Sequence, residues 1–422
     1  MRKIVEKEKH KELWIINHYA IPPNFAGSTR HFELAYELVK KGYRVKIFTC
    51  NFVAGKHQIY IKLKKDKLYS IENIKGVDFI WVRGAAYKKN NWRRAWNMLT
   101  FAYNCYKIKR NFKNKPEVIV GSSPSPIAAL VAARLAKKFK ANYFLELLDL
   151  WPQTIIDMGK FSKYHPITQT LRLLERYLYR VADKIIVLAE GSIKYLQKKY
   201  NIKESKILYL PNGVYLNNFS CQKDRNVLRK FYNFNKFTVI YTGAHGPANS
   251  LDTILGVADR LRENKDIEIV LVGNGILKES LLKQSKEMRL DNIRFLDAIP
   301  KIKIPGILSA ADAAIITLKK VKVFSYGVSP NKLFDYMAAR KPIICAVEGE
   351  MAEKVENIGC GISVIPEGEK SMADAIIYLA NLSQGELKKM GDKGYKEIVK
   401  NYSREKLDQK LINLIEKVNN EY

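Results

Sequence analysis

The sequence predicts two doubly wound α/β domains joined by a hinge near residues 201–219. The 422 residues are too many for one ordinary hydrophobic core. Short apolar runs alternate with amphipathic stretches of helical period along both halves of the chain. Loops that contain Gly or Pro follow several of these runs. We therefore expect an N-terminal domain over 1–205, a C-terminal domain over 206–400, and a final helix over 401–422 that packs back across the hinge.

The first half begins with a β–α–β unit. Residues 13–17 (LWIIN) are typical of a buried strand, and a loop rich in Pro and Gly follows them. The pattern then predicts a helix over 29–41, closed by Gly42, and a strand over 43–50, which requires a right-handed crossover. Further strands are expected at 118–121, 143–147, 184–188 and 207–210, and further helices at 126–140, 166–180 and 192–200.

The second half repeats this scheme. We expect strands at 237–242, 267–272, 293–296, 313–317 and 342–346, and helices at 251–264, up to 288, at 330–339 and at 403–421. Ligands of open parallel sheets bind beyond the carboxyl ends of the strands. Two such domains that face each other would place their substrates in the cleft between them.

Composition indicates a globular, soluble protein, with 47% hydrophobic and 27% charged residues. No run of eighteen apolar residues predicts a membrane-spanning helix, and the charged N-terminus does not read as a signal peptide. A cytosolic location is therefore expected. The cysteines lack metal-type pairing and are expected to be free thiols in a reducing compartment. They are Cys50, Cys105, Cys221, Cys345 and Cys360.

The positive charge is concentrated in the first half. Residues 1–210 hold 41 Lys and Arg against 16 Asp and Glu, whereas residues 211–422 hold 32 against 26. A basic surface of this kind favours an acidic partner, either a nucleic acid or an anionic membrane. No recognised nucleic-acid-binding motif accompanies it.

Residues 325–342 (SYGVSPNKLFDYMAARKP) combine a helix start with a cation. We expect Ser329 at the N-cap and Pro330 at the first helical position. The free N–H groups of a helix start suit a diphosphate, and Lys332 would neutralise charge on a departing one. Asp335, on the same face, would accept hydrogen bonds from ribose hydroxyls. A capped helix with a simple Lys332–Asp335 ion pair is an equal alternative.

This stretch resembles the donor-site signature of the family-four retaining glycosyltransferases, which have the GT-B fold of two Rossmann-like domains facing a central cleft. Asp335 matches the second acid of the signature, but Gly327 stands at the position of the first. The chain instead resembles the subgroup that reads SPNKL and relies on the lysine. The resemblance implies donor contacts from Ser329, Pro330 and Asn331, with backbone N–H groups around Gly327 and Val328 at the sugar.

Two further loops resemble phosphate- or sugar-facing loops of this family, although glycines that only end strands are an alternative. Many members carry a basic pair where Ala244 and Ser250 stand here, so the resemblance implies that Lys332, helped by His245, neutralises the phosphates. The residues concerned are Gly243, Ala244, His245 and Gly246 in the first loop, and Gly273, Asn274 and Lys278 in and after the second.

In the first domain, residues 26–30 (AGSTR) resemble the family's loop after the first strand. Gly27 and Ser28 would then face the acceptor, unless Ser28 simply caps a helix. Residues 146–152 (ELLDLWP) resemble a motif of bacterial fucosamine-type transferases, which makes Asp149 a catalytic candidate with helix capping as its rival. His18, just past the first strand, is a candidate for the cleft wall or an ordinary structural histidine.

Residues 87–112 contain a basic helical stretch with an aromatic stripe. The stripe suits either a membrane surface or the core of the first domain. It consists of Trp92, Trp96, Leu99, Tyr103 and Tyr106, and the basic residues around it are Lys88, Lys89, Arg93, Arg94, Lys107, Lys109 and Arg110.

No Asp-x-Asp motif or cluster of metal ligands occurs, so we expect neither a metal ion nor another bound cofactor. The resemblance implies a glycosyltransferase that retains the anomeric configuration. It also implies a UDP-linked, N-acetylated aminosugar donor and surface polysaccharide synthesis, of O-antigen or capsule. The basic aromatic stretch predicts peripheral association with the inner face of the plasma membrane and a polyprenyl-diphosphate-linked saccharide acceptor. The alternatives are a nucleotide-sugar epimerase on the same fold and a basic nucleic-acid-binding protein.

Overall fold

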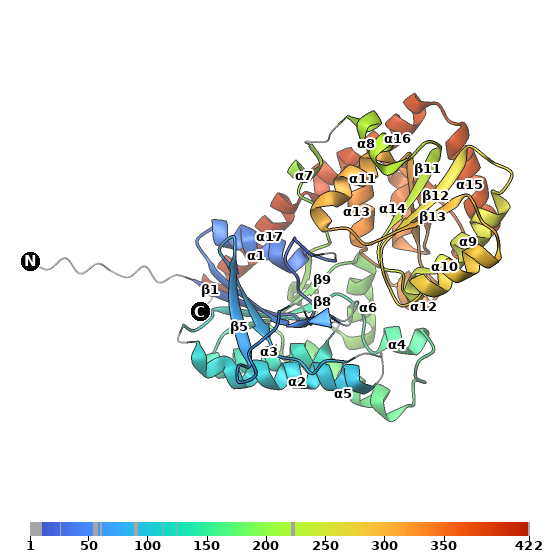
Figure 1. Ribbon diagram of the computed structural model, residues 1–422. Helices are drawn as coiled ribbons and strands as arrows, with labels where there is room; N and C mark the ends of the chain where they lie inside the picture. The colour runs from blue at the N-terminus through green and yellow to red at the C-terminus, as the bar shows by residue number, and fades with distance from the viewer. Residues whose placement is uncertain are drawn as a thin grey trace, which may run out of the picture.

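The computed structural model has two α/β lobes, each built on one sheet with helices on both faces (Figure 1). It describes residues 11–25, 27–53, 58–59, 61–87, 92–112, 114–123, 125–220 and 224–420. The predicted fold class is confirmed. All neighbouring strands of the C-terminal sheet are parallel, and so are nearly all those of the N-terminal sheet.

The N-terminal sheet has the strand order β10-β9-β8-β7-β1-β2-β6-β5. Its strands are β1 (Glu12–Ile16), β2 (Arg44–Cys50), β5 (Tyr69–Ile74), β6 (Val77–Val82), β7 (Val118–Ser123), β8 (Asn142–Leu147), β9 (Lys184–Val187) and β10 (Ile207–Tyr209). One face packs against α2 (Trp92–Ile108), α3 (Pro126–Phe139), α5 (Pro166–Val181) and α6 (Glu190–Tyr200), and the other against α1 (Arg30–Lys40) and α17 (Arg404–Asn420). The smaller elements are β3 (Phe52–Val53), β4 (Gln58–Ile59) and α4 (Gln153–Asp157).

The C-terminal sheet has the order β13-β12-β11-β14-β15-β16. Its strands are β11 (Phe237–Thr242), β12 (Ile267–Val272), β13 (Ile293–Leu296), β14 (Ala313–Thr317), β15 (Ile343–Ala346) and β16 (Gly361–Ser363). One face packs against α8 (Arg225–Tyr232), α11 (Ile304–Ala310), α13 (Asn331–Ala338) and α14 (Glu350–Ile358), and the other against α9 (Leu251–Arg260), α10 (Lys278–Glu287) and α15 (Glu369–Asn381). The remaining helices are α7 (Asn217–Ser220), α12 (Lys322–Ser325) and α16 (Gln384–Glu397).

The chain crosses between the lobes twice, and the two crossing segments are hydrogen-bonded to each other. The Val214 N–H donates to the Tyr402 carbonyl, and the Arg404 N–H donates to the Val214 carbonyl. Gly213 leaves no room for a side chain there, because a Cβ atom would lie 2.4 Å from the Tyr402 oxygen. After the second crossing, α17 returns to the N-terminal lobe and buries Leu407, Leu411 and Ile415 in its core.

The edge hairpin β5–β6 is a feature that the sequence pattern does not predict. Its turn places Lys75 and Gly76 at positive φ, 52° and 85°. Such turns favour Asn-Gly or Asp-Gly, and a lysine at the first position weakens the signal. The hairpin completes the sheet on the far side of β2.

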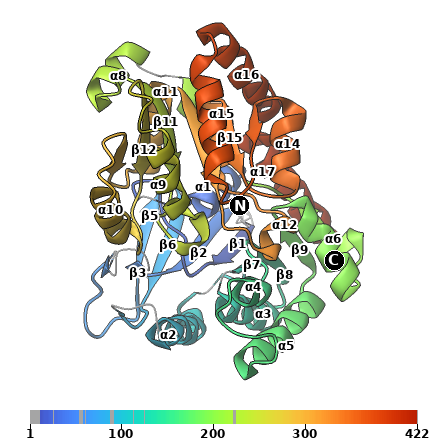
Figure 2. The same ribbon diagram turned by 90° about the vertical axis from the view of Figure 1, so that its right-hand side faces the viewer.

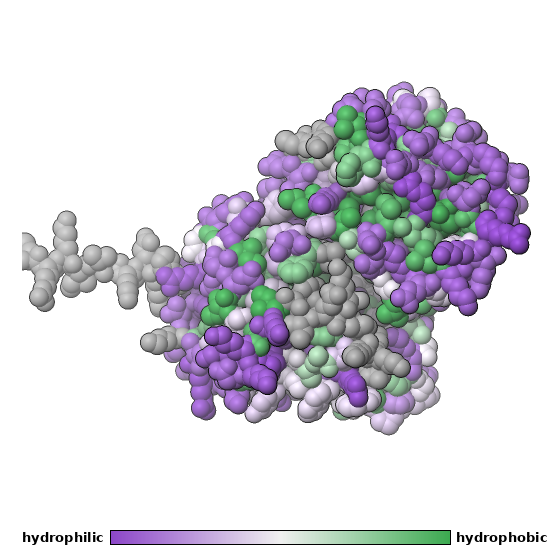
Figure 3. Space-filling model, viewed as in Figure 1, coloured by the Kyte–Doolittle hydropathy of each residue, from purple (hydrophilic) through white to green (hydrophobic). Residues whose placement is uncertain are grey.

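In the view of Figure 2, α2, α3 and α5 form the layer of the N-terminal lobe that lies farthest from the C-terminal lobe. Hydrophilic side chains cover most of both lobes in Figure 3, with apolar side chains scattered among them. Among the described residues, no helix is both long enough and apolar enough to cross a membrane.

Candidate functional site

Two glycine-containing loops of the C-terminal lobe interlock at the carboxyl ends of β11 and β12. A Cβ atom on Gly273 would lie 1.8 Å from the Gly243 carbonyl oxygen, and one on Gly275 would lie 2.3 Å from that of His245. The His245 N–H donates to the Asn274 carbonyl over 3.0 Å. Glycine is therefore required here so that one backbone can pack directly against the other. The contact fixes both loops at the edge of the sheet that faces the cleft.

Lys332, in the first turn of α13, reaches over the first of these loops. Its Nζ atom lies 2.9 Å from Tyr241 Oη and 3.2 Å from Asn249 Oδ1, and 4.1 Å from the centre of the Tyr241 ring. Neither partner is a carboxylate, so its charge is not neutralised by these contacts. Burial lowers the pKa of the Lys332 ammonium to about 7. The ammonium is thus held beside Gly243 with spare capacity for an anion.

The start of α13 differs by one residue from the expectation. Pro330 occupies the N-cap and the helix begins at Asn331, so the prediction of Ser329 as N-cap and Pro330 as first helical residue is corrected. Ser329 is instead bound to the crossing segment, where its Oγ accepts from the Asn212 N–H over 3.2 Å and its carbonyl accepts from the Asn212 amide. No side chain caps the helix, which leaves its first N–H groups available.

Asp335 does not pair with Lys332. It is buried, and both carboxylate oxygens accept from Lys301 Nζ, over 2.6 and 2.5 Å. Burial raises the pKa of Asp335, and the Lys301 charge opposes that rise. The alternative of an i,i+3 ion pair is therefore wrong, and the carboxylate already has a cationic partner in this structure.

His245 and Lys278 flank the same loops with different environments. His245 is fully buried, and neither of its ring nitrogens has a hydrogen-bond partner among the described residues. Burial, helped by the charges of Lys278 and Lys332, lowers the pKa of His245 to about 4, so the ring is neutral near pH 7. Lys278 bonds to Asn274 Oδ1 over 3.0 Å and to Asp297 over 2.7 Å, so its charge is already paired.

The loop after β1 approaches the start of α13 from the opposite lobe. Asn331 Nδ2 donates to Ser28 Oγ over 3.1 Å across the cleft. The neighbouring Gly27 has a φ of 144°, a backbone conformation that favours glycine. The helix α1 begins only at Arg30, and Ser28 makes no capping bond to it. The structure therefore brings Ser28, Asn331 and the first turn of α13 together, while Ala26 lies outside the described residues.

The lobes also touch where Gly327 meets the start of α6. Gly327 has a φ of 99°, and a Cβ atom there would lie 2.8 Å from Ala189 Cβ. Its N–H donates to the Phe324 carbonyl over 3.2 Å, so this donor group is engaged. Glu350 lies beside it and accepts from the Gly191 N–H over 3.0 Å. Val328 follows as a half-buried residue of the same segment.

Asp149 lies just beyond the carboxyl end of β8, on the cleft side of the N-terminal sheet. Solvent reaches its side chain, which has no hydrogen-bond partner among the described residues, although desolvation by its surroundings raises the pKa of the carboxyl. The helix after it, α4, has Pro152 at its N-cap and no side-chain cap. The structure therefore gives no support to the capping role for Asp149.

His18 and the aromatic stripe belong to the region of α2. His18 is buried, its Nε2 lies 2.7 Å from Asn97 Oδ1, and burial lowers its pKa to about 4. This is the environment of a structural histidine.

The aromatic stripe of α2, in contrast, faces outward, so the alternative that it fills the core is wrong. Its exposed fractions are 69% for Trp92, 53% for Trp96, 46% for Leu99, 66% for Tyr103 and 40% for Tyr106.

The basic residues beside the stripe differ in their exposure. Arg93 is exposed and lies over the Trp92 ring, with its Cζ 5.6 Å from the ring centre. Arg94 turns inward and donates to Tyr19 Oη over 3.2 Å. Lys88 and Lys89 lie outside the described residues, as does Cys221. The four described cysteines are free and buried.

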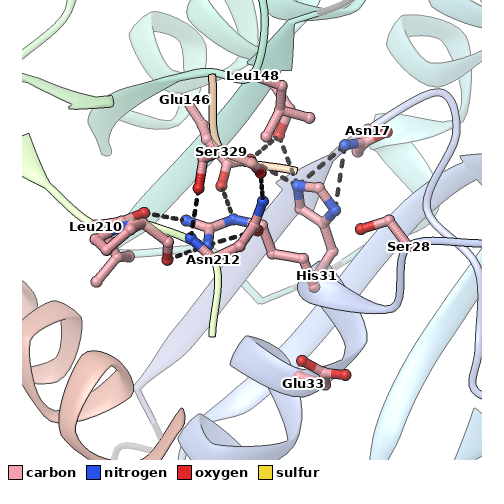
Figure 4. Close-up of polar contacts among 12 residues, drawn as sticks. Asn17, Ser28, His31, Glu33, Glu146, Leu148, Leu210, Asn212 and Ser329 are labelled. Carbon is pink, nitrogen blue, oxygen red and sulfur yellow. Dashed lines mark hydrogen bonds and ion pairs between the residues drawn. The ribbon is translucent and has the colours of Figure 1, made fainter. Parts of the chain in front are cut away.

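Arg30 is the main functional candidate that sequence reasoning misses. Its guanidinium is buried and donates to the carbonyls of Leu210 and Pro211, each over 2.9 Å, and to Glu146 over 2.8 Å. Figure 4 shows Glu146, Leu210, Asn212 and Ser329 gathered at this place. It also lies 3.3 Å from Asn212 Oδ1, and Asn212 in turn holds Ser329. Arg30 thus connects the start of α1, which follows the Gly27–Ser28 loop, to the hinge and onward to the segment before α13.

Glu146 anchors this cluster from the end of β8. Its second oxygen lies 2.6 Å from His31 Nε2 and accepts from Ser122 Oγ over 2.7 Å. Burial opposes ionisation, but the charges of His31 and Arg30 hold the pKa of Glu146 below its usual range. The only sequence signal for the cluster is the position of Arg30 and Glu146 next to motifs already singled out. Within the described part of the chain, no group of three or more His, Cys, Asp or Glu side chains is placed to hold a metal ion.

Comparisons with known families agree with this geometry. The model described as Glycosyltransferase Family 4 matches residues 27–218, and the model described as Glycosyl transferases group 1 matches residues 224–397. The two matches follow the two lobes. The chain is therefore a glycosyltransferase with the GT-B fold. These matches favour the transferase over the epimerase and the nucleic-acid-binding alternatives.

Two individual proteins of similar sequence are also described as glycosyltransferases. A probable glycosyltransferase, WbjE, of Pseudomonas aeruginosa is 24% identical over 311 residues, 71% of this chain and 74% of its own. A putative colanic acid biosynthesis glycosyl transferase, WcaI, of Escherichia coli strain K12 is 24% identical over 271 residues, 62% of this chain and 66% of its own.

Two solved structures show the same fold. Sucrose-phosphate synthase from Thermosynechococcus elongatus superposes with a TM-score of 0.79 at 16% identity, over 98% of this chain and 100% of that one. Anabaena HepE in complex with UDP-glucose gives a TM-score of 0.71 at 14% identity, over 97% and 100%.

Proposed function

We propose that this glycosyltransferase moves an N-acetylated aminosugar from a UDP-linked donor to a polyprenyl-diphosphate-linked saccharide. The product belongs to surface polysaccharide synthesis, and transfer retains the anomeric configuration without a metal ion. The observation that carries the proposal is the Lys332 ammonium, which lies at the start of α13 and beside Gly243 without a carboxylate partner.

The proposed chemistry relies on charge stabilisation in the cleft. The acceptor oxygen bonds to the anomeric carbon as the bond from that carbon to the diphosphate breaks. The acceptor proton passes to a diphosphate oxygen on the same face of the sugar. Lys332 and the first N–H groups of α13 stabilise the negative charge that develops. The buried, neutral His245 supports the glycine loops beside the diphosphate. Asp149, whose side chain solvent reaches, borders the reacting sugar from the other lobe.

The choice of substrates rests on relatives and on chemistry. HepE was solved with UDP-glucose, which supports a UDP-linked donor. WcaI is described as an enzyme of colanic acid biosynthesis, and a relative from Debaryomyces hansenii is described as a chitobiosyldiphosphodolichol beta-mannosyltransferase. The second name contains a lipid-linked diphosphate sugar, which supports a lipid-linked acceptor for this chain as well.

The donor part of the proposal is tested by thermal shift with a panel of nucleotide sugars, repeated with Lys332→Ala. We expect a UDP-linked N-acetylated aminosugar to give the largest stabilisation and the variant to lose most of it. Turnover is then measured with a polyprenyl-diphosphate saccharide, and NMR of the product gives its anomeric configuration. The same reaction with EDTA tests whether a metal ion is needed. An inverted product, or activity that EDTA abolishes, contradicts the mechanism.

The acceptor part places the outer face of α2 against the inner leaflet of the plasma membrane. Five large apolar side chains lie exposed on this one face, next to the exposed Arg93. Each basic residue near an anionic leaflet contributes about 1 kcal/mol to binding. Flotation with phosphatidylglycerol liposomes at low salt should carry the protein upward, and a Trp92→Ser, Trp96→Ser variant should stay below. Tyr378→Ser, at an equally exposed tyrosine of α15, is the matched control and should float normally.

A further inference from the structure

A basic cavity of about 1000 Å³ lies at the end of the N-terminal sheet that faces away from the cleft. It is formed where α5 and α6 end and where β9 begins, at Lys184. In a parallel sheet the cleft-facing loops follow the carboxyl ends of strands, whereas this cavity precedes the amino end of β9. None of the cleft residues described above lines it. Figure 2 shows α5 and α6 beside each other on the same side of the lobe.

The lining carries far more positive charge than the chain as a whole. Seven of its fifteen residues are Lys or Arg, against 73 of 422 in the sequence. The lining therefore has a larger share of Lys and Arg than the basic composition of the whole chain accounts for. Asp183 is the one acidic residue of the lining, and its Oδ2 already accepts from the Tyr143 N–H over 2.7 Å.

Several of these cations are held in place without being neutralised. Lys184 Nζ donates to the Ser205 carbonyl over 2.9 Å, and Lys206 Nζ donates to the Arg180 carbonyl over 3.0 Å. Both contacts orient an ammonium group and leave its charge unpaired. The side chains of four others, Arg176, Arg180, Lys198 and Lys203, make no ion pair with any described residue.

Helix ends account for only part of this charge. Basic residues are common in the last turn of a helix, because each C-terminus carries about half a negative charge. The C-termini of α5 and α6 together supply about one negative charge, and Asp183 supplies one more. A third carboxyl group, that of Glu175, accepts from Tyr179 and Tyr200 of the lining and lies near Lys199. Seven cations therefore leave a large excess of positive charge in one cavity.

We propose that this cavity binds a ligand with several phosphate groups, separately from the catalytic cleft. Arginine forks recognise phosphate oxygens in pairs, and lysines add mobile point charges. The seven cations exceed what a single phosphate neutralises, so the ligand is an oligophosphate or a lipid headgroup with more than one phosphate. The exposed Leu173 lies on α5 one turn before Arg176, which gives a lipid chain an apolar neighbour beside the headgroup site.

The test compares two charge-reversed proteins with equal net charge. Arg176→Glu with Lys203→Glu changes the cavity, and Lys230→Glu with Lys370→Glu makes the same change of charge at exposed positions of the C-terminal lobe. Tripolyphosphate binding is measured by calorimetry, and binding to vesicles that contain cardiolipin, whose headgroup carries two phosphates, is measured by flotation. We expect the cavity variant to lose at least tenfold in affinity for one of these probes and the control variant to stay within about twofold of the wild type.

Each outcome has a distinct meaning. A loss for tripolyphosphate identifies a soluble oligophosphate as the ligand, and a loss for vesicles alone identifies a lipid headgroup. Equal losses in both variants, or no binding of either probe by the wild type, overturn the proposal. Because tripolyphosphate can also enter the cleft, Lys332→Ala is measured in parallel. The inference does not depend on the proposed function, since thermal shift by the sugar donor should be unchanged in the cavity variant.

Discussion

Replacing Lys332 by alanine is expected to lower turnover by about 30- to 1000-fold. At about 4 Å and an effective dielectric constant of 20, two unit charges interact by about 4 kcal/mol. Departure of the diphosphate adds about one negative charge to the leaving group next to the ammonium, and residual solvent in the cleft reduces the effect to about 2–4 kcal/mol. The ammonium is well placed for this, because Tyr241 and Asn249 hold it without neutralising it.

The assay is release of UDP from the donor that the thermal-shift panel identifies, with kcat and KM measured separately. Lys278→Ala is the matched control, because this lysine also borders the glycine loops but is already paired with Asp297. We expect it to lower kcat by less than about tenfold. Turnover of the Lys332→Ala protein within threefold of wild type would refute the reasoning, as would an equal loss in both variants.

Three other predictions follow from the same geometry. The free enzyme holds the pKa of Lys332 near 7, and a bound diphosphate favours the charged form of the side chain. Binding of a UDP-sugar at pH 8 should therefore take up about one proton. Calorimetry in buffers of different ionisation enthalpy measures this uptake, and Lys332→Ala should abolish it. Arg30→Lys keeps the positive charge beside Glu146 but loses the forked contacts to the hinge. It should lower kcat at least tenfold with a small change in Tm. Arg404→Lys is the control, and a similar loss of kcat in both variants would mean that Arg30 has only a general structural role. Asp149→Asn should lower kcat by about 10²-fold without changing donor affinity in thermal shift, and unchanged kcat would exclude it from the reaction.

Much of the fold follows from local sequence pattern. The strands β11, β12, β13 and β14 have the bounds that the sequence predicts, because a buried parallel strand is a short apolar run with a polar or glycine residue at its end. The edge strand β5 is not predicted, because it is half-exposed and carries a weak apolar signal. Its partner β6 is a buried apolar run that the prediction misses. The helices α11, α14, α15 and α16 are also absent from the prediction.

The site is predictable in its residues but not in their partners. Lys332 and Gly243 are recognised from the sequence, and the structure places them side by side. The partners of Lys332 and Asp335 depend on tertiary contacts across 34 to 91 positions in the sequence, so helix spacing alone favours a pair that does not form. The start of α13 shifts by one residue for a similar reason, since Ser329 is bound by Asn212 of the crossing segment.

The start of α1 links substrate contact to the relative position of the lobes. The loop before it touches Asn331 through Ser28, and Arg30, two residues later, holds the first crossing segment at Leu210 and Pro211. A few residues on, Glu33 accepts from Arg404 over 2.8 Å, just after the second crossing. One helical turn therefore binds both segments on which any hinge motion depends. A ligand that moves the Ser28 loop must also act on this turn, so the geometry of the cleft and the angle between the lobes are set by the same few residues.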